Sequence, residues 1–135
     1  RTGNANVYVH VTTRDNRKHM KQDYFDHEKL DVYRVAIEFV LLGQKTIEKL
    51  PKGNSHLADQ LHRASTSITL NIAEGAGEIS KNEKIRFYRI ARRSATECAG
   101  ILDICDRLQL VEKTNHMKAR ELLIRIVSML TKMIK

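Results

Sequence analysis

The sequence has little of what sheet-rich or membrane-spanning proteins need. It contains one proline, no tryptophan and only 5% aromatic residues, and it is rich in residues that favour helices. No run approaches the ~20 consecutive apolar residues of a membrane-crossing helix. The N-terminus also lacks the charged, apolar and small-residue order of a secretory signal peptide. With 135 residues, the chain is expected to form an all-α cytoplasmic protein with one buried core.

Cysteine is also scarce, because the chain contains only Cys98 and Cys105. Their seven-residue separation places both thiols on one face of a helix about 10 Å apart, too far for a disulfide within that helix. We expect two buried thiols in a reducing compartment, with redox or metal-binding roles as the alternatives.

Residues 1–22 differ in composition from the rest of the chain. Asn4 to Thr13 alternates apolar and polar residues like a short strand, and the residues that follow are polar and basic. The segment is interpreted either as a non-native leader or as an upstream extension, with Met20 as the natural start. The folded domain is expected over residues 23–135.

Apolar residues at three- and four-residue spacing predict four amphipathic helices. The first is expected from about Asp31 to Lys49. The second is expected from Ser55, with Leu57, Leu61, Ala64, Ile68 and Ile72 inward. Gly75 and Gly77 are expected to end it in the left-handed conformation that glycine tolerates. The predicted core stripe of the first helix comprises Leu30, Tyr33, Ala36, Ile37, Val40, Leu41 and Ile47.

The third helix is predicted to be the longest. It begins with a capping box in which the Ser80 hydroxyl and the Glu83 carboxylate satisfy first-turn N–H groups, and it extends to about Leu108. A turn over residues 110–115 leads to the fourth helix. Four amphipathic helices with short connections predict an antiparallel up-down four-helix bundle.

Several segments of the chain resemble one protein family. Residues 63–77 read RASTSITLNIAEGAG and are followed by Ser80, Phe87 and the run IARRSATE. These segments resemble the 23S rRNA intervening-sequence proteins, small bacterial bundles related to the accessory variability protein of diversity-generating retroelements. The resemblance covers roughly residues 25–135. It implies a homo-oligomeric ring, commonly a pentamer, without catalytic activity, and nucleic-acid binding is the usual proposal for the family.

Positive charge is concentrated in the third helix. The chain has a net charge of +8, of which residues 1–19 supply +3 through four cations and one carboxylate. Arg86, Arg89 and Arg93 fall on one strip opposite the expected core side of the helix. A row of guanidinium groups can bind the phosphates of RNA or DNA without recognising the base sequence. The alternative is that these residues form a solvated helix face. The predicted nucleic-acid-binding residues are Lys81, Lys84, Arg86, Arg89, Arg92, Arg93 and Arg107.

Apolar residues on the flanks of the second and third helices predict a subunit interface. Leu70, Ala73, Ile85 and Tyr88 lie away from the centres of the core stripes of these helices. Apolar surface of this kind is typical of contacts between subunits, and two-sided burial within the bundle is the alternative.

A polar residue on the buried side of the second helix predicts a hydrogen-bond network. The Asn71 amide must find partners there, because an unsatisfied buried group costs ~1–3 kcal/mol. A structural network is expected, and a ligand or RNA site built from Arg63, Asn71 and Glu74 is the alternative. The predicted network comprises Arg63, Ser67, Asn71, Glu74, Ser94 and Glu97.

The sequence contains no pattern typical of an enzyme. Di-iron bundles use Glu-x-x-His pairs, and no glutamate here has a histidine three positions later. Neither a glycine-rich phosphate loop nor a paired-cysteine zinc motif is present. We therefore expect no catalytic residues, metal or cofactor. The expected partners are further copies of the chain and RNA or DNA, and a protein-interaction scaffold with no nucleic-acid role is the alternative.

Overall fold

A computed structural model describes residues 22–135, so the predicted extension over residues 1–22 lies outside this part of the chain except for Gln22. The elements are η2 (Asp26–Lys29), α2 (Asp31–Glu48), α3 (Ser55–Ala76), α4 (Lys81–Arg107) and α5 (Lys113–Ile134). The predicted all-α four-helix fold is confirmed. Among the described residues, no helix is long and apolar enough to cross a membrane.

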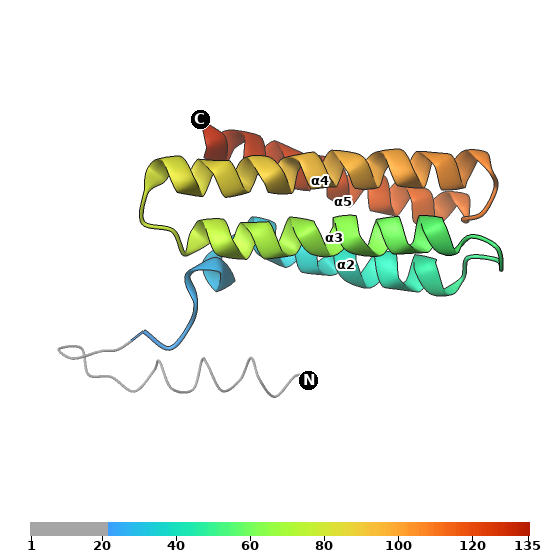
Figure 1. The fold of residues 1–135 in the computed structure, drawn as a ribbon, viewed down its shortest axis with the longest axis horizontal. Coiled ribbons are helices and arrows are strands. Elements are labelled where there is room, and N and C mark those ends of the chain that lie inside the picture. The colour runs from blue at the N-terminus through green and yellow to red at the C-terminus, as the bar shows by residue number, and fades with distance from the viewer. Residues whose placement is uncertain (1–21) are drawn as a thin grey trace.

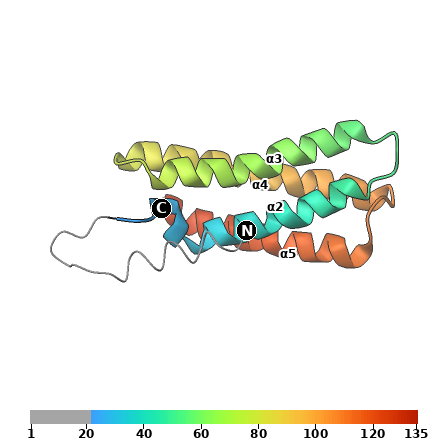
Figure 2. The ribbon, with the colours of Figure 1, turned by 90° about the horizontal axis from the view of Figure 1, so that it is seen from below.

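The four helices pack side by side, and the chain reverses direction at each connection (Figure 1). α3 lies beside α4 and α2 lies beside α5, while η2 packs on α2 and α3 (Figure 2). Within residues 22–135, no Cα atoms of α2 and α4, or of α3 and α5, lie within 8 Å of each other, so these pairs are diagonal across the bundle. Each helix therefore has two neighbours and one outer side.

The core consists of one apolar stripe from each helix. All five inward residues predicted for the second helix are buried in α3, and residues such as Cys98 and Leu102 of α4 and Leu122 and Ile126 of α5 are buried with them. The largest fully buried side chains include Phe39, Leu61, Ile68, Ile72, Ile126 and Leu130. Cys98 and Cys105 are free and buried in the same core. Burial, with a smaller contribution from the Glu97 carboxylate, raises the pKa of the Cys98 thiol to about 12.

The core stripe predicted for the first helix is partly wrong. The structure buries Val32, Val35 and Phe39, whereas Ile37 is 37% exposed and Leu41 is 60% exposed. Apolar residues surround most of this helix, so their spacing allows more than one inward side. The structure places the Phe39 ring inside the core, and this rotation of α2 turns the other two side chains outward.

Gly75 has a different role from the predicted helix end. It lies inside α3, and a Cβ atom at this position would come within 2.7 Å of Cε1 of Tyr88. Gly77 at the C-cap has a φ of −85°, so the left-handed conformation predicted for these two glycines is wrong. The absence of a side chain at Gly75 instead lets the Tyr88 ring pack against the backbone of α3.

A lysine on α4 satisfies the end of α3. The Nζ atom of Lys84 donates to the carbonyl oxygens of Gly75 and Ala76 at 2.9 and 3.1 Å. These carbonyls lie in the last turn of α3, where the helix supplies no i+4 backbone donor, and the Gly75 oxygen also accepts from the backbone N–H of Glu78 at 3.1 Å. The cation also lies at the negative end of the helix dipole, which favours positive charge.

The start of α4 agrees with the predicted cap in part. Ser80 Oγ accepts a hydrogen bond from the backbone N–H of Glu83 at 3.3 Å. The Glu83 carboxylate has a different partner from the one that a capping box requires, because it forms an ion pair with Arg86 at 3.0 Å. The helix therefore begins at the predicted residue with a different use of its acidic side chain.

We expect a Gly75→Ala substitution to lower the free energy of unfolding by about 1–3 kcal/mol, because the added methyl group would overlap the Tyr88 ring. Gly100→Ala is the matched control. Gly100 also lies within a helix, but a Cβ atom there would meet nothing within 4 Å. This control should raise the free energy of unfolding by about 0.5–1 kcal/mol. Urea unfolding followed by circular dichroism measures both, and equal effects would contradict the packing role of Gly75.

Candidate nucleic-acid interface

Several basic residues of α4 are held by contacts within the bundle. Besides the lysine that caps α3, Arg92 donates from Nη1 to Oγ1 of Thr131 on α5 at 3.2 Å. Arg86 pairs with Glu83, and its guanidinium lies 4.5 Å from the centroid of the Phe87 ring. These contacts orient the side chains, and the two arginines keep further N–H groups for other acceptors.

Arg89 and Arg93 differ from these residues because they are exposed and unpaired. Within residues 22–135, no hydrogen bond or ion pair engages either side chain. They lie on the outer side of α4, in the stretch 84–96, which contains five cations and no carboxylate. Lys81 is also exposed, at the start of the helix. Arg89 and Arg93 are therefore the cations of this helix best placed to meet a phosphate.

The remaining predicted residue, Arg107, is remote from these two. It lies 14 residues beyond Arg93, about 21 Å along the helix, and it is exposed. Between them the chain passes Glu97 and Asp103, which interrupt the positive charge. The structure thus limits the predicted basic strip to the N-terminal half of α4.

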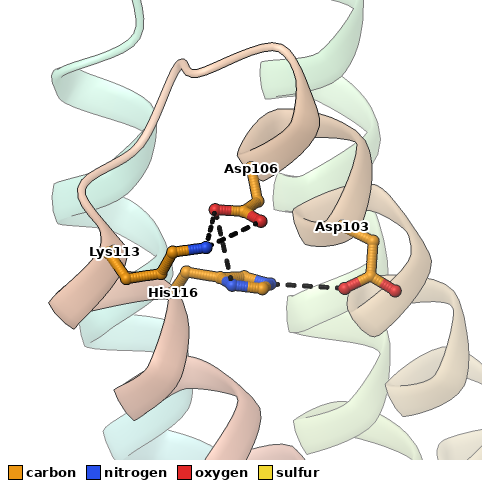
Figure 3. Close-up of polar contacts among 4 residues, drawn as sticks. All are labelled: Asp103, Asp106, Lys113 and His116. Carbon is orange, nitrogen blue, oxygen red and sulfur yellow. Dashed lines mark hydrogen bonds and ion pairs between the residues drawn. The ribbon is translucent and has the colours of Figure 1, made fainter.

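A charged cluster joins the other end of α4 to α5 (Figure 3). His116 Nε2 lies 3.3 Å from Asp103 Oδ1, and its Nδ1 lies 3.7 Å from Asp106 Oδ1. Lys113 Nζ contacts the two oxygens of the Asp106 carboxylate at 3.2 and 3.3 Å. The cluster places two carboxylates near Arg107. Among the described residues, no group of three or more His, Cys, Asp or Glu could hold a metal ion.

The last part of α5 adds positive charge that was missed in the sequence analysis. The bond between Arg92 and Thr131 places this part of α5 beside the basic half of α4. Residues 122–135 contain three cations and no carboxylate side chain, and Lys132 and Lys135 are exposed. The absence of Asp and Glu after residue 121 was the available signal, but only the packing of α5 on α4 brings the two basic segments together.

The predicted polar network contains three connected members. The hydroxyl oxygens of Ser67 on α3 and Ser94 on α4 lie 2.9 Å apart. Asn71 Nδ2 donates to the backbone oxygen of Ser67 at 2.8 Å and to its Oγ at 3.1 Å. The three side chains therefore link the middle of α3 to α4.

The other predicted network members, Arg63, Glu74 and Glu97, are exposed on the surface. Among the described residues, no hydrogen bond joins them to the three connected side chains. A ligand site built from Arg63, Asn71 and Glu74 gains no support from this arrangement, because one of its three members is turned into the α3–α4 contact.

The residues predicted for a subunit interface are not brought together as one exposed patch. Tyr88 is buried against Gly75, and burial raises the pKa of its hydroxyl. Ala73 and Ile85 are half-buried, and Leu70 is exposed on α3. The prediction is therefore wrong for Tyr88, because the missing side chain at Gly75 creates a place for its ring inside the bundle.

We expect Asn71→Ala and Ser94→Ala each to lower the free energy of unfolding by about 0.5–1.5 kcal/mol through the lost hydrogen bonds. Ser128→Ala, at an exposed serine of α5, is the control and should change stability by less than about 0.5 kcal/mol. Thermal and urea unfolding measure the three variants. If Asn71→Ala alters neither stability nor assembly, the structural interpretation of the network is wrong.

Comparison with known proteins finds a matching family model and solved structures of similar fold. The family model described as "23S rRNA-intervening sequence protein" matches residues 28–132. A crystal structure of a protein of unknown function from the S23 ribosomal protein family of Bacteroides thetaiotaomicron superposes with a TM-score of 0.72. The two chains are 23% identical, and the match covers 77% of this chain and 98% of that chain. This likeness shows a shared fold. No curated protein matches the sequence.

Proposed function

Because this chain belongs to the 23S rRNA-intervening sequence protein family, we propose that it acts without catalysis as a homo-oligomeric bundle in the cytoplasm. In this proposal the copies form a ring, with five copies as the expected number. The ring binds RNA or DNA largely independently of sequence through the N-terminal half of α4. Further copies of the chain and nucleic acid are thus its proposed partners.

The observation that carries the nucleic-acid proposal is the pair of unpaired arginines on α4. Arg89 and Arg93 project from a stretch of 13 residues, 84–96, that contains no carboxylate, and within residues 22–135 Arg93 forms no ion pair with Glu97, four residues later. Guanidinium groups bind phosphate oxygens bidentately, and such contacts position a nucleic acid without reading its bases. The exposed lysines at the end of α5 extend the positive charge beside them.

Exposed apolar side chains on more than one side of the bundle support assembly. Leu41 on α2, Leu70 on α3 and Met117 on α5 all have more than half of their surface exposed. A two-fold contact uses the same patch on both copies, whereas a head-to-tail contact joins two different patches and closes into a ring when the rotation permits. A head-to-tail contact requires such apolar groups on separate helices.

A scaffold that binds an acidic protein is the second candidate function. The exposed apolar side chains favour it, since they suit a protein partner better than a phosphate backbone. The salt dependence of binding separates the two candidates. Nucleic-acid affinity falls with salt with a log–log slope of about 0.7–0.9 per phosphate contact.

We expect the variant with Arg89→Glu and Arg93→Glu to bind ribosomal RNA fragments at least about tenfold more weakly than the wild type, with a salt slope smaller by roughly 1.4–1.8. Electrophoretic titration at several salt concentrations measures both quantities. The control carries Lys45→Glu and Lys118→Glu, which change the net charge equally at exposed positions elsewhere. Equal losses in both variants would contradict the α4 interface. Absence of binding by the wild type would favour the scaffold.

Light scattering at micromolar concentration tests assembly. One chain has a mass of 15.6 kDa, and we expect the wild type to have about five times that mass. The physical reason is that association removes the exposed apolar side chains from water, at roughly 25 cal/mol per Å² of apolar surface. A particle with the mass of one chain would rule out the homo-oligomer.

A further inference from the structure

An apolar groove runs between α4 and α5 on the outer side of the bundle. It is lined by Ala95, Ala99, Leu123, Ile124, Val127 and Arg120, together with two hydroxyl side chains. On the α4 side, the groove is lined by the small side chains of Ala95 and Ala99. On the α5 side, the Ile124 side chain is 54% exposed. The groove has a volume of about 210 Å³. A cavity of about 150 Å³ accepts benzene, so the groove has room for one aromatic ring.

Cations border this groove. Arg120 lines it directly, and Arg92 bridges the two helices through Thr131 on the side nearer the start of α4. The helix segments that lead from the groove to that end, 84–96 and 122–135, contain no carboxylate side chain. An occupant that combines an apolar group with negative charge would therefore complement both the floor of the groove and its surroundings.

The chain itself contains such a segment at the start of its described part. Residues 22–31, QDYFDHEKLD, carry four carboxylates and one lysine. Within this segment the Phe25 side chain is 65% exposed. Its ring stacks on His27 with centroids 5.6 Å apart, and its backbone N–H donates to Glu28 Oε1 at 3.0 Å. These contacts hold an apolar ring outward on an acidic segment.

The acidic segment and the groove lie on opposite sides of one bundle. η2 packs on α2 and α3, whereas the groove lies between α4 and α5 (Figures 1 and 2). Phe25, at the start of η2, thus lies across the bundle from the groove of its own chain. A neighbouring copy can offer its groove to this ring while its own ring remains available to a third copy.

We infer that Phe25 of one copy inserts into the α4–α5 groove of a second copy, with Asp23, Asp26 and Glu28 facing the cations around it. This inference rests on the proposed homo-oligomer and identifies the contact that joins its subunits. The contact is head-to-tail because it uses two different patches, so repetition closes a ring or extends a filament. The acidic residues supply the electrostatic match that selects this orientation.

Two variants, each blocking one half of the contact, test the inference by light scattering at micromolar concentration. Phe25→Asp removes the ring and leaves the groove intact, and Ala99→Trp fills the groove and leaves the ring intact. Each variant alone should have the mass of one chain. An equimolar mixture should form a particle of two chains, because one complete contact remains between the variants. Ile104→Asp is the control, since this residue of α4 is 50% exposed and lies outside the groove, and it should keep the wild-type mass.

A charge exchange tests the contact if circular dichroism shows that Ala99→Trp does not fold. Arg120→Glu should weaken the assembly at least tenfold, and adding Asp26→Arg to the same chain should restore much of the affinity. Light scattering over a dilution series measures these affinities. If Arg120→Glu assembles with the wild-type affinity, or if Asp26→Arg restores nothing, the contact is overturned.

The outcomes separate this inference from the homo-oligomer on which it rests. A wild type with the mass of one chain overturns both. If the wild type, Phe25→Asp and a folded Ala99→Trp all assemble, the contact is overturned and the homo-oligomer remains in place. Single-chain variants whose mixture forms no two-chain particle overturn the head-to-tail arrangement.

Discussion

The close contact between α3 and α4 at Gly75 determines which side of α4 faces outward. Because this residue has no side chain, the Tyr88 ring lies against the backbone of α3, and Lys84 reaches the last carbonyls of that helix. The hydroxyl pair of Ser67 and Ser94 joins the same two helices further along. Together these contacts set the rotation of α4 about its axis, which directs Arg89 and Arg93 outward.

That rotation divides the cations of α4 into different roles. Lys84 and Arg92 complete contacts with the neighbouring helices, whereas Arg89 and Arg93 remain unpaired within the described residues. A count of charge along the sequence treats all of them alike. The two free guanidinium groups carry the nucleic-acid proposal. The carboxylates of the Asp103 and Asp106 cluster limit the basic surface to one half of the helix.

The two proposed contacts use different sides of α4. Arg92 faces α5 beside the groove, and Arg93, one residue later, points about 100° away around the helix. A neighbouring copy seated in the groove therefore leaves Arg93 open to a nucleic acid. The α4 residues that line the groove have small apolar side chains, whereas the residues proposed to bind phosphate have long charged ones. One helix can therefore carry both contact surfaces.

The sequence by itself determined the four helices, the start of α4 at Ser80 and the core stripe of α3, because one-sided apolar spacing and end signals act within a single segment. Only the tertiary structure decided which side of α2 faces inward, since apolar residues surround that helix. The same holds for the packing role of Gly75, the burial of Tyr88 and the pairing of Lys84 and Arg92. Each of these depends on atoms from two helices that meet only when the chain folds.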